Sequence, residues 1–176
     1  MTLDRVLQLT AVVLLVGVGA PGLRAGEAVS EQILQVTPEV TLTGALAPEA
    51  AQALAASNTL VVDLRGTDEG ADAEARAMAL AGGDYVHLPQ TGQPPAAGDV
   101  EFFRDLLAVN GDRPVVVHCR SGNRAALLWG AYRLDQGATL PEVLAEVEPI
   151  ATSEVIRQAI ADYAQGSPEG SPEGDS

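Results

Sequence analysis

The sequence contains no lysine, a single cysteine and few aromatic residues, which make up 3% of its 176 residues. The ten positive charges are all arginines, and 24 acidic residues bring the net charge to −14. A chain this acidic lacks the basic surface that nucleic acids and anionic membrane surfaces require, so we exclude nucleic acid as a partner. One cysteine cannot form a disulfide within the chain, so no internal disulfide stabilises the fold.

Residues 1–25 are predicted to be a secretory signal peptide that lies outside the fold. Arg5 precedes an apolar run from Val6 to Ala20, and small residues lead to a cleavage site after Ala25. We therefore expect a periplasmic or secreted protein with no stable membrane insertion after cleavage. An uncleaved anchor helix is the alternative, although the run is short for spanning a bilayer. Residues 26–37 are predicted to be a lead-in, and residues 166–176, rich in Ser-Pro-Glu-Gly, a disordered acidic tail.

Residues 38–165 are predicted to form one domain in which strands alternate with helices. The predicted strands are β-branched, apolar runs at Val40–Thr43, Thr59–Leu64, Asp84–Leu88 and Arg113–His118. The predicted helices are Pro48–Ser57, Asp68–Leu80, Val100–Val109 with Asp99 as its N-cap, Arg124–Leu134, Leu140–Ile150 and Ser153–Ala164. This alternation predicts a single-domain α/β fold with a mainly parallel sheet flanked by helices, which binds ligands at the carboxyl ends of its strands.

The cysteine lies in the run VVVHCRSGNRAALLW, which predicts a strand, a tight loop and a helix. Backbone amides of the loop residues, together with the helix N-terminus, are expected to cradle an oxyanion. The cradle residues are Arg120, Ser121, Gly122 and Asn123, and Gly122 permits a left-handed or closely approaching backbone. This environment favours Cys119 as a thiolate nucleophile, and the planar fork of Arg124 can hold two oxygens. A small buried hydrophobe is the alternative role for the cysteine.

Three further residues are supporting candidates. His118 precedes the cysteine and is expected to order the loop by hydrogen bonding, with direct acid–base work as the alternative. Asp63 ends a strand at the same sheet edge, where it shapes the pocket or caps the next loop. Asp99, besides capping a helix, is the nearest acid to the loop that follows the third strand. Since His87 and His118 lack a matching carboxylate cluster, we expect no metal and no cofactor.

The motif HCRSGNRAALLW resembles the active loop of beta-lactamase hydrolase-like, dual-specificity-phosphatase-like bacterial proteins, within the cysteine-dependent protein tyrosine phosphatase superfamily. The segments LTG, TLVVDLR, YVHLP and PVVVHC occur in the phosphatase order, and the resemblance covers about residues 38–165. It implies a phosphatase-like fold, with Cys119 as nucleophile, Arg124 as the anchor of the transition state and residues 120–123 lining the cradle.

Three features depart from the phosphatase pattern. Four residues separate Cys119 from Arg124, whereas tyrosine-phosphatase loops have five, and the shorter spacing resembles rhodaneses, which move sulfur through a cysteine persulfide. Ala125 stands where phosphatases usually carry Ser or Thr. The loop after YVHLP has no aspartate general acid, and Asp99 is the nearest acid.

The function that we predict is an exported cysteine-dependent phosphatase-like hydrolase, which cleaves a phosphate monoester through a Cys119 thiophosphate intermediate. A rhodanese-like sulfurtransferase that uses a Cys119 persulfide is the first alternative, and a non-catalytic anion-binding module is the second. The expected partner is a small anionic substrate, or a phosphorylated or sulfur-carrying molecule. The sequence leaves the oligomeric state open.

Overall fold

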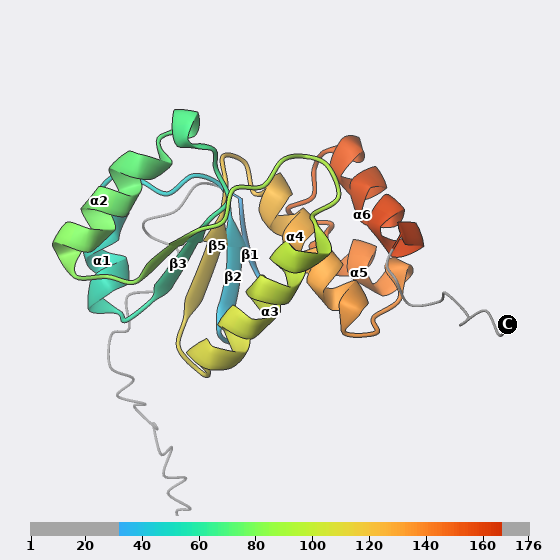
Figure 1. The fold of residues 1–176 in the computed structure, drawn as a ribbon, viewed down its shortest axis with the longest axis horizontal. Helices are drawn as coiled ribbons and strands as arrows, with labels where there is room; N and C mark the ends of the chain where they lie inside the picture. The colour runs from blue at the N-terminus through green and yellow to red at the C-terminus, as the bar shows by residue number, and fades with distance from the viewer. Residues whose placement is uncertain (1–31, 167–176) are drawn as a thin grey trace, which may run out of the picture.

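The computed structural model describes residues 32–166 (Figure 1). Its elements in chain order are β1 (Ile33–Gln35), β2 (Val40–Thr43), α1 (Ala50–Ala56), β3 (Leu60–Asp63), the 3-10 helix η2 (Thr67–Glu69), α2 (Ala71–Ala81), β4 (Tyr85–His87), α3 (Ala97–Asn110), β5 (Val115–His118), α4 (Asn123–Asp135), α5 (Leu140–Val147) and α6 (Glu154–Gly166). The strands pair in the order β1-β2-β5-β3-β4, and every pair is parallel except β1 with β2. The predicted α/β domain with a mainly parallel sheet is confirmed.

Helices cover both faces of the sheet, so the central strands β3 and β5 are buried along their whole length. On one face, α1 and α2 pack over Val61 and Val116. On the other, α3 to α6 pack over Val62 and Val117 (Figure 1). Successive side chains of a strand point to opposite faces, so a strand buried on both faces is apolar at nearly every position. This explains why the two central strands were recognisable from the sequence.

The parallel pairing brings the carboxyl ends of β2, β5 and β3 to one edge of the sheet. His118, the last residue of β5, is in register with Thr43 of β2 and with Asp63 of β3. The segments that leave these three strands therefore start side by side. The cysteine loop is the middle one, and the other two can contact it.

The structure corrects two predicted helices. The predicted helix over Asp68–Leu80 is divided, because Gly70 takes a left-handed conformation (φ 92°) between η2 and α2. Asp99 is not an N-cap, since α3 begins two residues before it and Ala96 occupies the N-cap position. The Asp99 carboxylate instead accepts a hydrogen bond from Gln90 Nε2 at 3.0 Å.

The apolar stretch Ile33–Val36, which was not assigned to a strand from the sequence, supplies β1. The predicted signal peptide, residues 26–31 of the lead-in and residues 167–176 of the tail lie outside the described residues. Over residues 32–166, no helix has the length and apolar character needed to cross a bilayer.

Candidate active site

The cysteine loop joins β5 to α4 at the carboxyl edge of the sheet, and the segment after β2 fixes its first half. Cys119 has no disulfide partner and is 1% exposed. Its amide donates to the Thr43 carbonyl at 3.3 Å, and the Ala45 amide donates to the Arg120 carbonyl at 3.2 Å. The backbone on both sides of the thiol is thus tied to β2 and to the residues that follow it.

Asn123 fixes the second half of the loop. Its side-chain amide donates to Ser121 Oγ and to Thr152 Oγ1, both at 3.2 Å. Its side-chain oxygen accepts from the Ser153 amide at 3.0 Å. These bonds tie the loop to the connection between α5 and α6, so Asn123, predicted to line the cradle, also anchors it.

The start of α4 supplies the amides of the predicted oxyanion cradle. The first i→i−4 bond of this helix runs from the Ala126 amide to the Gly122 carbonyl at 2.9 Å. The amides of Asn123, Arg124 and Ala125 precede it and have no intrahelical acceptor, at the positive end of the helix dipole. Gly122 has φ +82°, as expected from the sequence. An anion above this turn would meet several N–H groups.

Acceptors from two other segments hold the Arg124 side chain. Nη1 donates to Glu69 Oε2 at 2.7 Å and to the Leu64 and Gln90 carbonyls at 3.2 Å, while Nη2 donates to Glu69 Oε1 at 2.7 Å. A guanidinium has five N–H donors. The bonds to Glu69 and to the two carbonyls leave Nε–H and one Nη2–H, an edge that can hold two oxygens of an anion. A hydrogen bond between the guanidinium and Cys119 also contributes to the raised pKa of Arg124.

Interactions at the site favour the ionised forms of Arg124 and Glu69. Hydrogen bonding to Glu69 raises the pKa of Arg124, burial opposes the rise, and interaction with Cys119 adds to it. The hydrogen bonds from Arg124 and from the Gly66 amide lower the pKa of Glu69 from 4.5 to about 2. Glu69 therefore stays ionised and positions the arginine rather than transferring protons near neutral pH.

The pKa of Glu69 predicts how the stability of the protein depends on pH. Because the folded-state pKa of about 2 is below the ordinary 4.5, ionised Glu69 stabilises the fold above pH 4.5, and this contribution is lost as the pH falls toward 2. We expect Glu69→Gln to lower the free energy of unfolding near neutral pH and to have little effect near pH 2. Chemical denaturation of both proteins measures this. A difference that stays constant over the range would contradict the assignment.

A second cluster of charged side chains is buried at the end of β3. Asp63 is fully buried and accepts hydrogen bonds from Arg65 Nε at 3.0 Å, Arg65 Nη2 at 2.7 Å and the Tyr85 hydroxyl at 2.7 Å. Burial alone would raise the pKa of Asp63, but the hydrogen bond from Arg65 and the charge of His118 hold it below its ordinary value. Asp63 therefore fixes the Arg65 side chain.

His118 belongs to this second cluster and not to the loop. Its ring is fully buried, and Nε2 lies 2.7 Å from Glu74 Oε1 and 3.6 Å from Asp63 Oδ1. The closer contact lacks the alignment of a hydrogen bond, and neither ring nitrogen has a hydrogen-bond partner among the described residues. The prediction that His118 orders the loop by hydrogen bonding is wrong. The alternation of the strand turns its side chain toward α2, away from the face where Val117 and Cys119 lie.

Sequence reasoning missed Glu69 and Glu74. Both follow β3, whose carboxyl end adjoins that of β5. Arg65, Glu69 and Glu74 lie in the segment that follows β3 and starts beside the cysteine loop. Their place at this edge of the sheet was the one signal in the sequence that they could contribute to the site. Their individual partners could not be assigned from it.

Residues 28–136 match the family described as beta-lactamase hydrolase-like protein, phosphatase-like domain. The chain belongs to this family. The matched stretch contains all five strands, the cysteine loop and α4, which confirms the resemblance to the cysteine-dependent phosphatase superfamily. Among curated proteins, none matches this sequence.

Solved structures share the fold at low sequence identity. A candidate phosphatase from Shewanella putrefaciens CN-32 is 22% identical, with a TM-score of 0.64 over 79% of this chain and 89% of that one. A candidate phosphatase from Neisseria meningitidis z2491 is 23% identical, with a TM-score of 0.62 over 76% and 99%. TpbA of P. aeruginosa, solved in complex with pTyr, is 18% identical, with a TM-score of 0.60 over 81% and 91%. At these identities the likeness establishes the fold.

Proposed function

We propose that this domain is an exported cysteine-dependent phosphatase that hydrolyses phosphate monoesters. The observation that carries the proposal is the placement of Arg124 beside Cys119. Glu69 and two carbonyls hold one part of the guanidinium, and its remaining N–H edge is available to an anion next to the thiolate. The apolar run before Ala25 supports export.

In the first proposed step, the Cys119 thiolate attacks phosphorus, an S–P bond forms and the ester P–O bond breaks. The leaving oxygen takes a proton and departs as an alcohol or phenol. In the second step, water attacks phosphorus and breaks the S–P bond, which releases inorganic phosphate and regenerates the thiolate. The α4 amides and Arg124 stabilise the equatorial oxygens in both steps, and their fixed positions supply the rate enhancement.

Asp99 is the acid that we assign to the leaving oxygen. It has no capping role, and Gln90 connects it to the site. Gln90 Nε2 donates to Asp99 at 3.0 Å, while the Gln90 carbonyl accepts from Arg124 at 3.2 Å. In the proposed reaction its carboxyl group delivers a proton to the ester oxygen that leaves.

The loop length favours a second candidate function, sulfur transfer. Four residues lie between Cys119 and Arg124, and a smaller cradle suits a persulfide. In that reaction Cys119 attacks the outer sulfur of a sulfane donor, an S–S bond forms as the donor's own bond breaks, and a thiophilic acceptor removes the sulfur. No general acid is needed.

The burial of Cys119 favours the third candidate, an anion-binding module without turnover. A thiol in a residue that is 1% exposed is shielded from bulk reagents. Slow alkylation at neutral pH, with tight phosphate binding, is what this alternative predicts. Rapid alkylation that phosphate suppresses is what both enzymatic alternatives predict.

Turnover of two substrates in parallel tests the proposal. The reduced protein is supplied with p-nitrophenyl phosphate, and separately with thiosulfate and cyanide, and Cys119→Ser serves as the blank for both. We expect phosphate release that depends on Cys119, with no thiocyanate above the blank. Trapping the acid-quenched enzyme should show a mass increase of one phosphoryl group on Cys119.

The other outcomes are equally decisive. Thiocyanate without phosphate would mean that the loop length sets the chemistry and that the phosphatase proposal is wrong. Phosphate release by Cys119→Ser at the wild-type rate would exclude the thiophosphate intermediate. Absence of both products, with phosphate bound, would favour the anion-binding module.

A further inference from the structure

A groove of about 330 Å³ lies between α6 and the segment that connects β4 to α3. One wall is formed by residues 92–94 of that segment, and the other is a single face of α6. The α6 residues that line the groove are Glu154, Val155, Gln158, Ala159 and Asp162. This spacing places them on successive turns of the helix, so the groove follows α6 for about 12 Å.

Both walls of the groove are hydrogen-bonded to the start of α4, beside the cysteine loop. Ser153, the residue before α6, donates its amide to Asn123 Oδ1 at 3.0 Å. Gln90, two residues before Gly92, accepts a hydrogen bond through its carbonyl from Arg124 Nη1 at 3.2 Å. The groove therefore starts next to the oxyanion cradle and leads away from it along α6.

The lining of the groove provides an apolar strip that is open to a partner. Val155 is 64% exposed, although its side chain is aliphatic, and Ala159 lies one turn further along the same face of α6. Gly92 and Pro94 line the opposite wall. A strip of this kind suits the aliphatic stem of a long side chain whose charged head reaches beyond it.

The carboxylates in the groove differ in how they are paired. Glu154, in the first turn of α6, forms an ion pair with Arg157. The Asp162 carboxylate accepts a hydrogen bond from the neutral amide of Gln158 at 2.8 Å, and no cationic side chain within residues 32–166 pairs with it. The groove thus carries an unbalanced negative charge at the end that lies away from the cradle.

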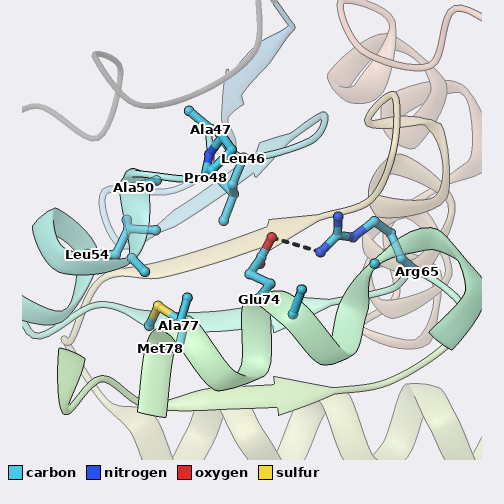
Figure 2. Close-up of a pocket in the computed structure, with 12 residues that line it drawn as sticks. Leu46, Ala47, Pro48, Ala50, Leu54, Arg65, Glu74, Ala77 and Met78 are labelled. Carbon is cyan, nitrogen blue, oxygen red and sulfur yellow. Dashed lines mark hydrogen bonds and ion pairs between the residues drawn. The ribbon is translucent and has the colours of Figure 1, made fainter. Parts of the chain in front are cut away.

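The cavity between α1 and α2, by contrast, has its carboxylate paired within the protein. Figure 2 shows Glu74 reaching Arg65, whose Nη2 donates to Glu74 Oε2 at 2.7 Å. The other oxygen, Oε1, lies 2.7 Å from His118 Nε2. No residue from 119 to 124 lines this cavity. Neither its charge nor its position connects it to a substrate in the cradle, whereas the groove along α6 has both.

We propose that the groove along α6 binds the chain that flanks a phosphorylated residue in a peptide segment, and that it favours a basic flank; this inference rests on the proposed phosphatase function. The phosphoryl group occupies the cradle, and about four residues of extended chain span the groove. The stem of an arginine in this flank covers Val155 and Ala159, and its guanidinium pairs with Asp162.

Charge also decides which molecule occupies the groove. A chain with a net charge of −14 repels a phosphate ester, and a basic flank offsets this repulsion and steers the substrate to the site. Residues 167–176, which follow α6, include three acidic residues and no basic one, so the groove repels this segment. A second copy of the acidic chain is repelled for the same reason.

Three phosphotyrosyl peptides of one length test the proposal on the purified, reduced protein. They differ only in two residues on each side of the phosphotyrosine, which are arginine, glutamine or glutamate. We expect kcat/KM of the arginine peptide to exceed that of the glutamate peptide at least about tenfold, mainly through KM, and this ratio to shrink as salt is added. p-Nitrophenyl phosphate, which has no flanking chain, is the reference substrate.

Two matched variants separate the groove from the net charge of the chain. Asp162→Arg reverses the charge at the end of the groove and should reduce the preference for the arginine peptide at least about fivefold. Asp112→Arg makes the same change at an exposed residue before β5, at the opposite edge of the sheet, and should change the preference less than about twofold. Turnover of p-nitrophenyl phosphate should stay near wild type in both, and thermal unfolding shows that both are folded.

Several results would overturn the proposal. Equal kcat/KM for the arginine and glutamate peptides would show that the groove does not recognise the charge of the flank. If Asp112→Arg reduces the preference as much as Asp162→Arg does, then the net charge of the chain is the cause and the groove is not.

Failure of the proposed function gives a different result. If the protein hydrolyses neither p-nitrophenyl phosphate nor any of the peptides, the phosphatase proposal is wrong. Fluorescence anisotropy of the labelled peptides with Cys119→Ser then judges the groove by itself. Tighter binding of the arginine peptide that Asp162→Arg removes would support the groove, and equal binding or no binding of the peptides would overturn it.

Discussion

Replacing Arg124 with alanine is expected to lower kcat for phosphate monoester hydrolysis by about a thousandfold. The side chain is held by Glu69 and by the Leu64 and Gln90 carbonyls, so its remaining N–H edge is fixed before any substrate binds. Prearranged donors of this kind act mostly on the transition state, because the charge they face develops there. The loss should therefore appear mainly in kcat, with a smaller rise in KM.

Matched variants show whether the loss comes from geometry or from charge. Arg124→Lys keeps the charge but has no planar fork, and we expect it to recover little of the activity. Arg133→Ala removes the same charge from the other end of α4 and should leave kcat close to wild type. If Arg124→Lys restores most of the activity, or if Arg133→Ala loses as much as Arg124→Ala, then the fork is not what the reaction requires.

A smaller loss of activity on replacing Glu69 would support the conclusion that Glu69 positions Arg124. Glu69→Gln turns one acceptor into a donor that faces the guanidinium, so Arg124 loses its bidentate partner and keeps the two carbonyls. We expect a loss of activity between those of Arg133→Ala and Arg124→Ala. The coupling between positions 69 and 124, measured by a double-mutant cycle, reports how much of the arginine's contribution depends on being positioned.

The sequence revealed the central strands and the cysteine loop because their signals are local. TLVVDL and VVVH are apolar at nearly every position, as strands buried on both faces must be. Gly122 in the cysteine loop indicated a left-handed backbone conformation, which the structure confirms. The start of α3 was misplaced because Asp99 is a preferred capping residue, while the actual N-cap, Ala96, gives no sequence signal.

The partners of the charged side chains could not be predicted, because they are far apart in the sequence. Glu69 meets Arg124 across 55 positions, and no pattern of spacing encodes that contact. The side on which His118 lies was predictable from strand alternation alone. Its place beside Glu74 was not, since it depends on how α2 packs on the sheet.

Replacing Gly122 with alanine is expected to destabilise the protein by roughly 2–5 kcal/mol, from two separable causes. The backbone at Gly122 has φ +82°, which disfavours any side chain. In addition, a Cβ there would lie 2.5 Å from Ile150 Cγ1 and 2.6 Å from its Cδ1. Ile150 is fully buried, so it cannot move aside without disturbing the packing around it. The destabilisation is a large fraction of the stability of a typical domain.

Gly137→Ala is the matched control for this prediction. Gly137 has nearly the same φ, +86°, but a Cβ there would meet no atom within 4 Å. It should therefore report the backbone strain alone, about 1–2 kcal/mol. Chemical denaturation of both variants gives the two free energies of unfolding, and their difference is the cost of the contact with Ile150.

A double-mutant cycle with Ile150→Ala completes the separation. Ile150→Ala alone destabilises the protein by creating a cavity, but in that background the new methyl group at position 122 has space. Gly122→Ala should then cost about as much as Gly137→Ala does in the wild type. If Gly122→Ala lowers the free energy of unfolding by the same amount in both backgrounds, then the loop moves away from Ile150 to relieve the overlap, and contact with Ile150 does not fix the position of the loop. If the contact does hold the loop, Gly122→Ala should also lower phosphatase kcat in the folded fraction, because the amides of Asn123 and Arg124 move with the turn that Gly122 forms.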